Sequence, residues 1–76
     1  MITADRVRLR TLLSTIRREG GTWTTRRAQD VYRPLGIVQR GTARHDLAAL
    51  ARRGHLVAVP GHDRAYRVNH AGGERR

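Results

Sequence analysis

The sequence predicts a small α+β domain in which three helices are followed by a C-terminal β-hairpin. Three stretches carry apolar residues at helical spacing, the third starting near residue 39. Further on, Pro60-Gly61 separates two runs that contain valine and tyrosine, which is typical of a hairpin. The 76 residues include no cysteine, so an apolar core must hold the fold without disulfides. We expect the domain to span residues 1–69 and a flexible tail to span 70–76.

The first helix is expected over residues 4–19. Thr3 is expected to cap it, and Asp5 suits the positive end of the helix dipole. Gly20 and Gly21 then end the helix. The apolar side chains follow the i, i+3, i+4, i+7 pattern of one helix face, and they are Leu9, Leu12, Leu13 and Ile16.

A minimal strand and a second helix are expected next. Residues 22–24 have β-strand character, and Trp23 is expected to pack between the helices and the hairpin. Thr24 or Thr25 offers an N-cap for a helix over about residues 25–33. Pro34 disfavours helical backbone at the residue before it. The inward side chains of this helix are expected to be Ala28, Val31 and Tyr32.

The third helix is expected to run from Gln39 to Gly54, a good residue for a helix C-terminus. Its apolar stripe consists of Ala43, Leu47, Leu50 and Ala51. The other side is expected to carry Gly41, Thr42, His45, Ala48, Ala49 and Arg52, with Arg44 on its flank. We expect Asp46 to anchor an arginine of its own domain rather than to read a cytosine. Asp30 is placed to pair with Arg26, Arg27 or Arg33.

The two runs after this helix, residues 56–59 and 65–68, are expected to pair as a hairpin. The loop between them should contain about four to five residues. Tyr66 and Val68 would close the core from this side.

Positive charge dominates the composition. The chain has 16 basic residues, all arginine, against six acidic ones, giving a net charge of +10 and a pI near 11.9. A domain with a pI above about 9 is expected to bind a polyanion, and nucleic acid is the first candidate. Arg6, Arg8 and Arg10 spread around the first helix and are expected to form a solvated face.

Catalysis is not expected from this sequence. Ser14, the only serine, has no histidine near it, no carboxylates cluster, and no glycine-rich phosphate loop follows a strand. The four histidines lack the close i, i+4 pair of a zinc site, so neither a metal nor a cofactor is expected. No apolar run is long enough for a membrane span and no signal peptide is recognisable. We therefore expect a cytoplasmic, nucleoid-associated protein.

One segment resembles a known DNA-binding motif. The stretch VQRGTARHDLAAL, residues 38–50, is similar to the recognition-helix signature T-x-R-x-D-L of deoxyribose-operon-repressor-type bacterial regulators. The matching residues are Thr42, Arg44, Asp46 and Leu47. His45 stands where those regulators usually have a second arginine, and Gln39 where they usually have a capping serine. With this order of elements, residues 4–69 resemble a winged helix-turn-helix domain. The resemblance extends to the DNA-binding module alone and not to the sugar-phosphate-sensing domain of those repressors.

The resemblance implies that residues 40–53 lie in a DNA major groove. It also implies that residues 59–65 form a wing on the adjacent backbone or minor groove. The residues expected to contact bases are Arg40, Gly41, Thr42, Arg44 and His45. Those expected to contact phosphates are Thr25, Arg26, Arg27, Gln39, Arg52 and Arg53. Those expected at the wing are His62 and Arg64.

Several of these roles have alternatives. Arg44 could contact a base, a phosphate or only solvent. Thr42 could contact a thymine methyl group, a phosphate or its own helix backbone. Gly41 is either a point of close approach to the bases, together with Ala48 and Ala49, or simply a loose helix start. His45 could donate to a guanine or to a phosphate.

The function expected is sequence-specific binding of double-stranded DNA, as a small bacterial, phage or plasmid transcriptional regulator. The alternatives with the same fold are a recombination or excision accessory factor, a plasmid partition protein and a DNA-translocase docking module. RNA-binding and protein-interaction modules form a third class. A homodimer or a cooperative assembly on adjacent half-sites would reinforce the binding of a single domain, and no membrane partner is expected.

Overall fold

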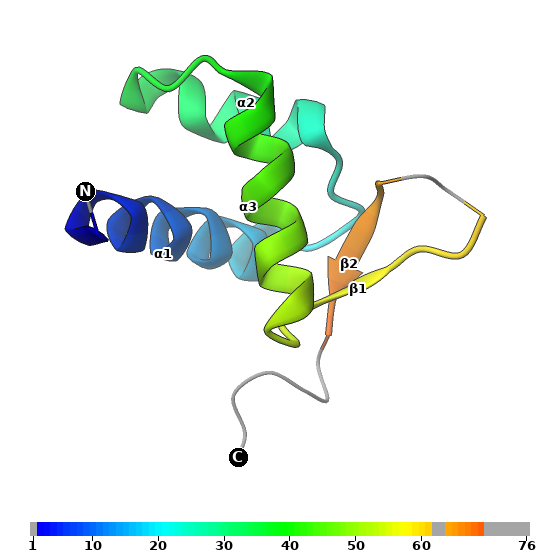
Figure 1. Ribbon diagram of the computed structural model, residues 1–76. Coiled ribbons are helices and arrows are strands. Elements are labelled where there is room, and N and C mark those ends of the chain that lie inside the picture. Colours follow the sequence, from blue (N-terminus) through cyan, green and yellow to red (C-terminus); the bar gives the residue numbers. More distant parts are fainter. Residues whose placement is uncertain (1, 62–63, 70–76) are drawn as a thin grey trace.

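The computed structural model describes residues 2–61 and 64–69, with side chains described from residue 6 onwards. These residues form a small α+β domain of three α-helices, one 3-10 turn and a two-stranded antiparallel sheet (Figure 1). In chain order the elements are α1 (Ile2–Glu19), α2 (Thr25–Tyr32), η1 (Arg33–Leu35), α3 (Arg40–Arg52), β1 (Leu56–Ala58) and β2 (Tyr66–Val68). The predicted class, α+β with a C-terminal hairpin, is confirmed. The proposed tail, residues 70–76, lies outside the described residues.

The core lies where the three helices and the hairpin meet. Its buried side chains are Leu12, Ile16, Trp23, Ala28, Tyr32, Ala43, Leu47, Leu50 and Leu56. Partly buried residues pack against this cluster, among them Leu9, Leu13, Val31, Ala51, Tyr66 and Val68. All of these except Leu56 were expected to face inward. No helix in the described part of the chain is both long and apolar enough to cross a membrane.

Helix α1 begins at Ile2, two residues before the expected start. Thr3 therefore lies inside the helix, and the predicted cap at this residue is wrong; the side chains of Thr3 and Asp5 lie outside the described residues. The helix ends as predicted at Gly20, whose left-handed φ of 66° only glycine adopts readily. The Gly20 N–H donates to the Ile16 carbonyl at 2.8 Å, which completes the last turn.

The predicted short strand at residues 22–24 is a single antiparallel bridge. The Trp23 N–H donates to the Tyr66 carbonyl at 2.7 Å, and the Tyr66 N–H donates back at 2.8 Å. The Trp23 side chain is fully buried, and its indole N–H donates to the Gly20 carbonyl at 3.0 Å. Trp23 therefore joins the helices to β2, as predicted, and satisfies its one polar atom.

Helix α2 is capped by Thr24, one of the two predicted N-caps, whose hydroxyl accepts from the Arg27 N–H at 3.3 Å. Helix α2 ends at Tyr32, and the helical backbone continues as the 3-10 turn η1, which contains Pro34 near its start. Gly36, with φ at 81°, then reverses the chain toward α3. Proline fits this position because it needs no N–H partner in the first turn of a helix.

The hairpin pairs Leu56 with Val68, Val57 with Arg67 and Ala58 with Tyr66. A further hydrogen bond, from the Val59 N–H to the Ala65 carbonyl at 2.9 Å, continues the pairing beyond both strands. Residues 60–64 remain as the loop, which agrees with the predicted length. Residues 62 and 63, and with them the expected wing residue His62, lie outside the described residues.

Candidate functional site

The orientation of α3 is set by one buried carboxylate. Asp46 is fully buried, and its two oxygens accept from Arg8 of α1, from Nε at 2.6 Å and from Nη2 at 3.0 Å. The Tyr32 hydroxyl of α2 donates to the same carboxylate at 2.5 Å. A single side chain of α3 is therefore tied to both other helices, and the predicted role of Asp46 as the anchor of an arginine is confirmed.

Arg8 corrects one prediction. It was expected on a solvated face with Arg6 and Arg10, whereas its side chain is only 19% exposed and bound to Asp46. The spacing along the helix could have predicted the burial of Arg8, because Arg8 lies on the same helix face as the buried Leu12 and Ile16, at intervals of four residues. Arg6 and Arg10 are exposed, as expected.

Burial and hydrogen bonding fix the charge state of this cluster. Burial by itself would raise the pKa of Asp46, but the hydrogen bonds from Arg8, Tyr32 and His45 outweigh it and hold the pKa below its ordinary value. Burial, followed by the hydrogen bond to Asp46, raises the pKa of Tyr32 above its ordinary value. Asp46 is therefore an ionised acceptor and Tyr32 a neutral donor.

The anchor also decides which side of α3 is exposed. Thr42, Asp46 and Ala49 follow one another at intervals of four and three residues and so share one line along the helix. Because Asp46 faces the interior, the other residues on this line do so too: Ala49 is buried and Thr42 half-buried. The prediction that Ala49 faces outward is therefore wrong. The apolar stripe alone does not predict the burial of Ala49, because the polar Asp46 is buried together with that stripe.

The exposed half of α3 centres on a different line. Gly41, His45, Ala48 and Arg52 recur at intervals of four, three and four residues, and all but the half-buried Ala48 are exposed. The exposed Arg40 and Arg44 lie beside this line. We call these six residues the outer face of α3. Within the described part of the chain, its three arginines make no hydrogen bond or ion pair.

Gly41 is not required by the packing of the domain. Its φ lies outside the left-handed region, and a Cβ atom built on it would meet no atom within 4 Å. Gln39, at the N-cap of α3, accepts no capping hydrogen bond with its exposed side chain. The first turn of α3 therefore has open space at Gly41 and no capping hydrogen bond from the N-cap side chain.

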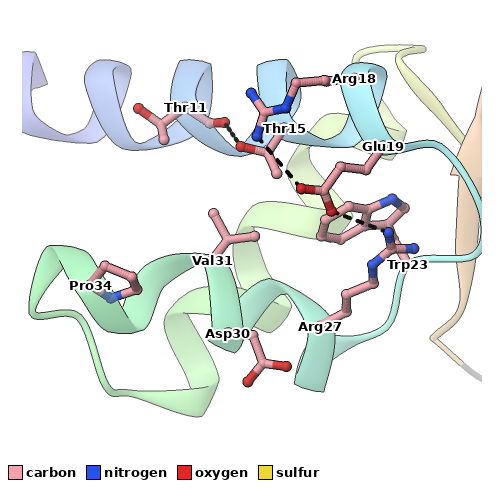
Figure 2. A pocket seen from close by; sticks show the side chains of 9 residues that line it. All are labelled: Thr11, Thr15, Arg18, Glu19, Trp23, Arg27, Asp30, Val31 and Pro34. Carbon is pink, nitrogen blue, oxygen red and sulfur yellow. Dashed lines mark hydrogen bonds and ion pairs between the residues drawn. The ribbon is translucent and has the colours of Figure 1, made fainter.

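Arg26 and Arg27, expected together at the start of α2, differ sharply. The Arg27 guanidinium donates to the carbonyls of Gly20 and Thr22, each at 3.0 Å, and lies 3.9 Å from the centroid of the Trp23 ring. It also reaches the Glu19 carboxylate at 3.4 Å (Figure 2). Arg26 is exposed and has no such contact among the described residues. Thr25, the first residue of α2, is half-buried.

The two arginines at the end of α3, Arg52 and Arg53, also lie in different surroundings. Arg52 belongs to the outer face, whereas Arg53 lines a hollow against α1. The side chains lining this hollow are Arg6, Leu9, Arg10, Leu13, Leu50, Arg53 and His55. At the hairpin, Arg64 is exposed and has a left-handed φ of 57°. The structure thus groups Arg40, Gly41, Arg44, His45 and Arg52 and sets Arg53 apart.

A groove also lies between α1 and α2. Figure 2 shows Thr11, Thr15, Trp23 and Arg27 among the residues that line it. Glu19 bridges Arg27 and Arg18, the latter at 3.6 Å. Asp30 pairs instead with Arg33 at 3.3 Å, one of the three predicted partners. In the described residues no group of histidine and carboxylate side chains is placed to hold a metal ion.

Comparisons with protein-family models, with curated proteins and with solved structures found no match to this chain.

Proposed function

We propose that the chain binds double-stranded DNA as a winged helix-turn-helix domain, with the outer face of α3 in the major groove. The observation that supports this is the contrast in how charge is placed on α3. Asp46, on the inner side, is neutralised by Arg8. The three arginines of the outer face have no ion-pair partner among the described residues, and they share that face with the small residues Gly41 and Ala48.

The chemistry of the outer face suits base edges. The major groove is wide enough for one helix, and the small side chains of Gly41 and Ala48 let the helix backbone approach the bases. A guanidinium donates two parallel hydrogen bonds to O6 and N7 of guanine, which is the role proposed for Arg44 and Arg40. Arg52, near the other end of the face, is assigned to a phosphate.

Phosphate contacts at the flanks would fix the position of α3. Arg26 stands exposed in the first turn of α2, where the helix dipole adds positive potential. Arg64, at the hairpin loop, is assigned to the phosphates or the minor groove beside the wing. Arg27 is better suited to positioning, because its guanidinium is already bound to carbonyls and stacked on Trp23.

The test compares two variants that lose the same charge. Arg44→Ala should weaken binding to a selected duplex by about 1–3 kcal/mol and relax the preference at one or two base pairs. Arg10→Ala, on the exposed side of α1, should change binding only slightly and leave the base preference intact. Equal weakening of selected and random duplexes by both variants would show that the outer face does not read bases.

Salt dependence tests the electrostatic part of the proposal. If the domain neutralises about five phosphates, log K should fall against log salt with a slope of roughly −4.5. Arg26→Ala should make this slope less steep by about one unit and weaken all duplexes alike. A slope near zero would contradict DNA binding through these arginines.

We further propose that this binding serves transcriptional regulation. Footprinting distinguishes this use from the architectural ones: a regulator should protect a short site beside a promoter, whereas a partition or recombination factor should cover clustered repeats. Selection of bound duplexes from a genomic library would also report the spacing of half-sites, and with it any pairing of two domains.

A further inference from the structure

The ring of His45 connects the outer face of α3 to the buried carboxylate. The side chain of His45 is 70% exposed, yet its Nδ1 atom lies 3.3 Å from Oδ1 of the fully buried Asp46. One edge of the imidazole thus turns toward the interior. The other nitrogen, Nε2, lies on the opposite edge of the ring.

The hydrogen-bond inventory of Asp46 determines which nitrogen of His45 carries the hydrogen. Oδ2 accepts from Arg8 Nε and from the Tyr32 hydroxyl. Oδ1 accepts from Arg8 Nη2 and faces His45 Nδ1. An ionised carboxylate has only acceptor sites, about four in all, so every group that forms a hydrogen bond with it must be the donor. Nδ1 must therefore donate as well.

This assignment leaves Nε2 of the neutral ring as an acceptor. A neutral imidazole has one N–H, and in His45 it is used toward Asp46. Nε2 can then accept a hydrogen bond from a partner but cannot donate one. Only protonation of the ring gives Nε2 a hydrogen, while the Nδ1–H bond to Asp46 is retained.

We propose that neutral His45 selects a base with an exocyclic amine in the major groove, N6 of adenine or N4 of cytosine, and that protonated His45 favours guanine instead. The inference rests on the proposed function, since it assigns a base class to one position of the outer face. It also replaces the expectation that His45 simply donates to guanine. Guanine offers only acceptors, N7 and O6, in the major groove, so it cannot pair with the Nε2 lone pair.

The charged and titratable groups around the ring come from all three helices. Asp46 of α3 faces Nδ1, and behind it stand Arg8 of α1 and Tyr32 of α2. The pKa of Asp46 is lowered and that of Tyr32 raised, so neither changes charge between pH 5.5 and 8. The other charged side chains of the outer face are Arg40, Arg44 and Arg52.

The first experiment needs no DNA. Nitrogen-15 NMR of the full chain at pH 8 distinguishes a protonated ring nitrogen from an unprotonated one, and the His45→Gln variant assigns the signals. We expect the Nδ1–H tautomer at His45. The Nε2–H tautomer would overturn the inference whatever the protein binds.

The second experiment selects duplexes from a random library at pH 8 and at pH 5.5 in the same salt. At one base-pair position we expect the preference to move from adenine or cytosine toward guanine, by about tenfold in relative affinity. In His45→Gln, whose side chain does not titrate, the preference should be the same at both pH values. His55→Gln, a change at a histidine on the α1 side, should keep the shift.

The outcomes separate the two proposals. If no duplex is bound at either pH, the proposed function fails and the base assignment fails with it. If duplexes are bound but the preference does not move with pH, or moves equally in His45→Gln, the inference fails while DNA binding stands. A shift that is lost in His45→Gln and kept in His55→Gln supports it.

Discussion

The two sides of α3 treat charge in opposite ways. On the inner side, Asp46 is fully buried and accepts hydrogen bonds from two other helices. On the outer face, three exposed arginines make no ion pair with the described residues. A buried charge without a partner costs several kcal/mol, whereas an exposed one costs little. Stability should therefore depend on the inner side, and binding on the outer face.

The largest expected effect is on the inner side. Asp46→Asn removes the charge that Arg8 and Tyr32 share and should lower the free energy of unfolding by about 3 kcal/mol in a urea titration. Asp30→Asn is the matched control, because Asp30 pairs with Arg33 on the exposed surface and should cost less than about 1 kcal/mol. If the Asp46 variant does not fold, Tyr32→Phe should still lower stability, by about 1.5 kcal/mol. Equal effects of the two aspartate changes would remove the distinction between the two sides.

The same cluster should make stability depend on pH at both extremes. The folded-state pKa of Asp46 is below its ordinary value of 3.8, so its contribution is complete above that pH and is lost as the pH falls further. The pKa of Tyr32 is raised above 10.0, so its contribution is complete below pH 10 and is lost as the pH rises. Thermal unfolding across pH 2–12 measures both the acid and the alkaline loss of stability. An alkaline loss that persists unchanged in Tyr32→Phe would contradict the assignment to Tyr32.

The neighbours Arg26 and Arg27 allow a smaller test of the same comparison. Arg27→Ala removes two hydrogen bonds to backbone carbonyls, the ion pair with Glu19 and the stacking on Trp23. Because the side chain is partly exposed, the expected cost is only about 1–2 kcal/mol of stability. Arg26→Ala should change stability by less than about 0.5 kcal/mol but weaken DNA binding. Unfolding and duplex titrations of both variants measure these effects. The opposite pattern would mean that the two residues exchange roles.

The smallest effect concerns the first turn of α3. Gly41→Ala should raise stability by roughly 0.5–1 kcal/mol, because glycine is a poor helix former and the space around its Cβ position is open. Gly36→Ala is the control: its surroundings are equally open, but φ is 81°, and alanine there should lower stability. If Gly41 is a point of close approach, the more stable variant should bind DNA less well. Unchanged binding would reduce Gly41 to a loose helix start.

Local sequence patterns determined the elements of this fold. The apolar spacing in α1 and α3, a threonine cap before α2, and Pro60-Gly61 between two β-rich runs each act within a few residues. For this reason the class, the order of the elements and most of the core could be predicted. The concentration of arginine predicts a polyanionic partner, and this stays a prediction that the binding experiments test.

Only the tertiary structure decided which charges are used inside the domain. Arg8 and Asp46 are 38 residues apart. The helical spacing of Arg8 with Leu12 and Ile16 places it on the inner face of α1 but does not identify Asp46 as its partner. This pairing depends on how α1 crosses α3. It turns Ala49 toward the core and so determines which residues of α3 form the outer face. Such pairings follow from packing, because a buried charge must find its partner wherever the chain places it.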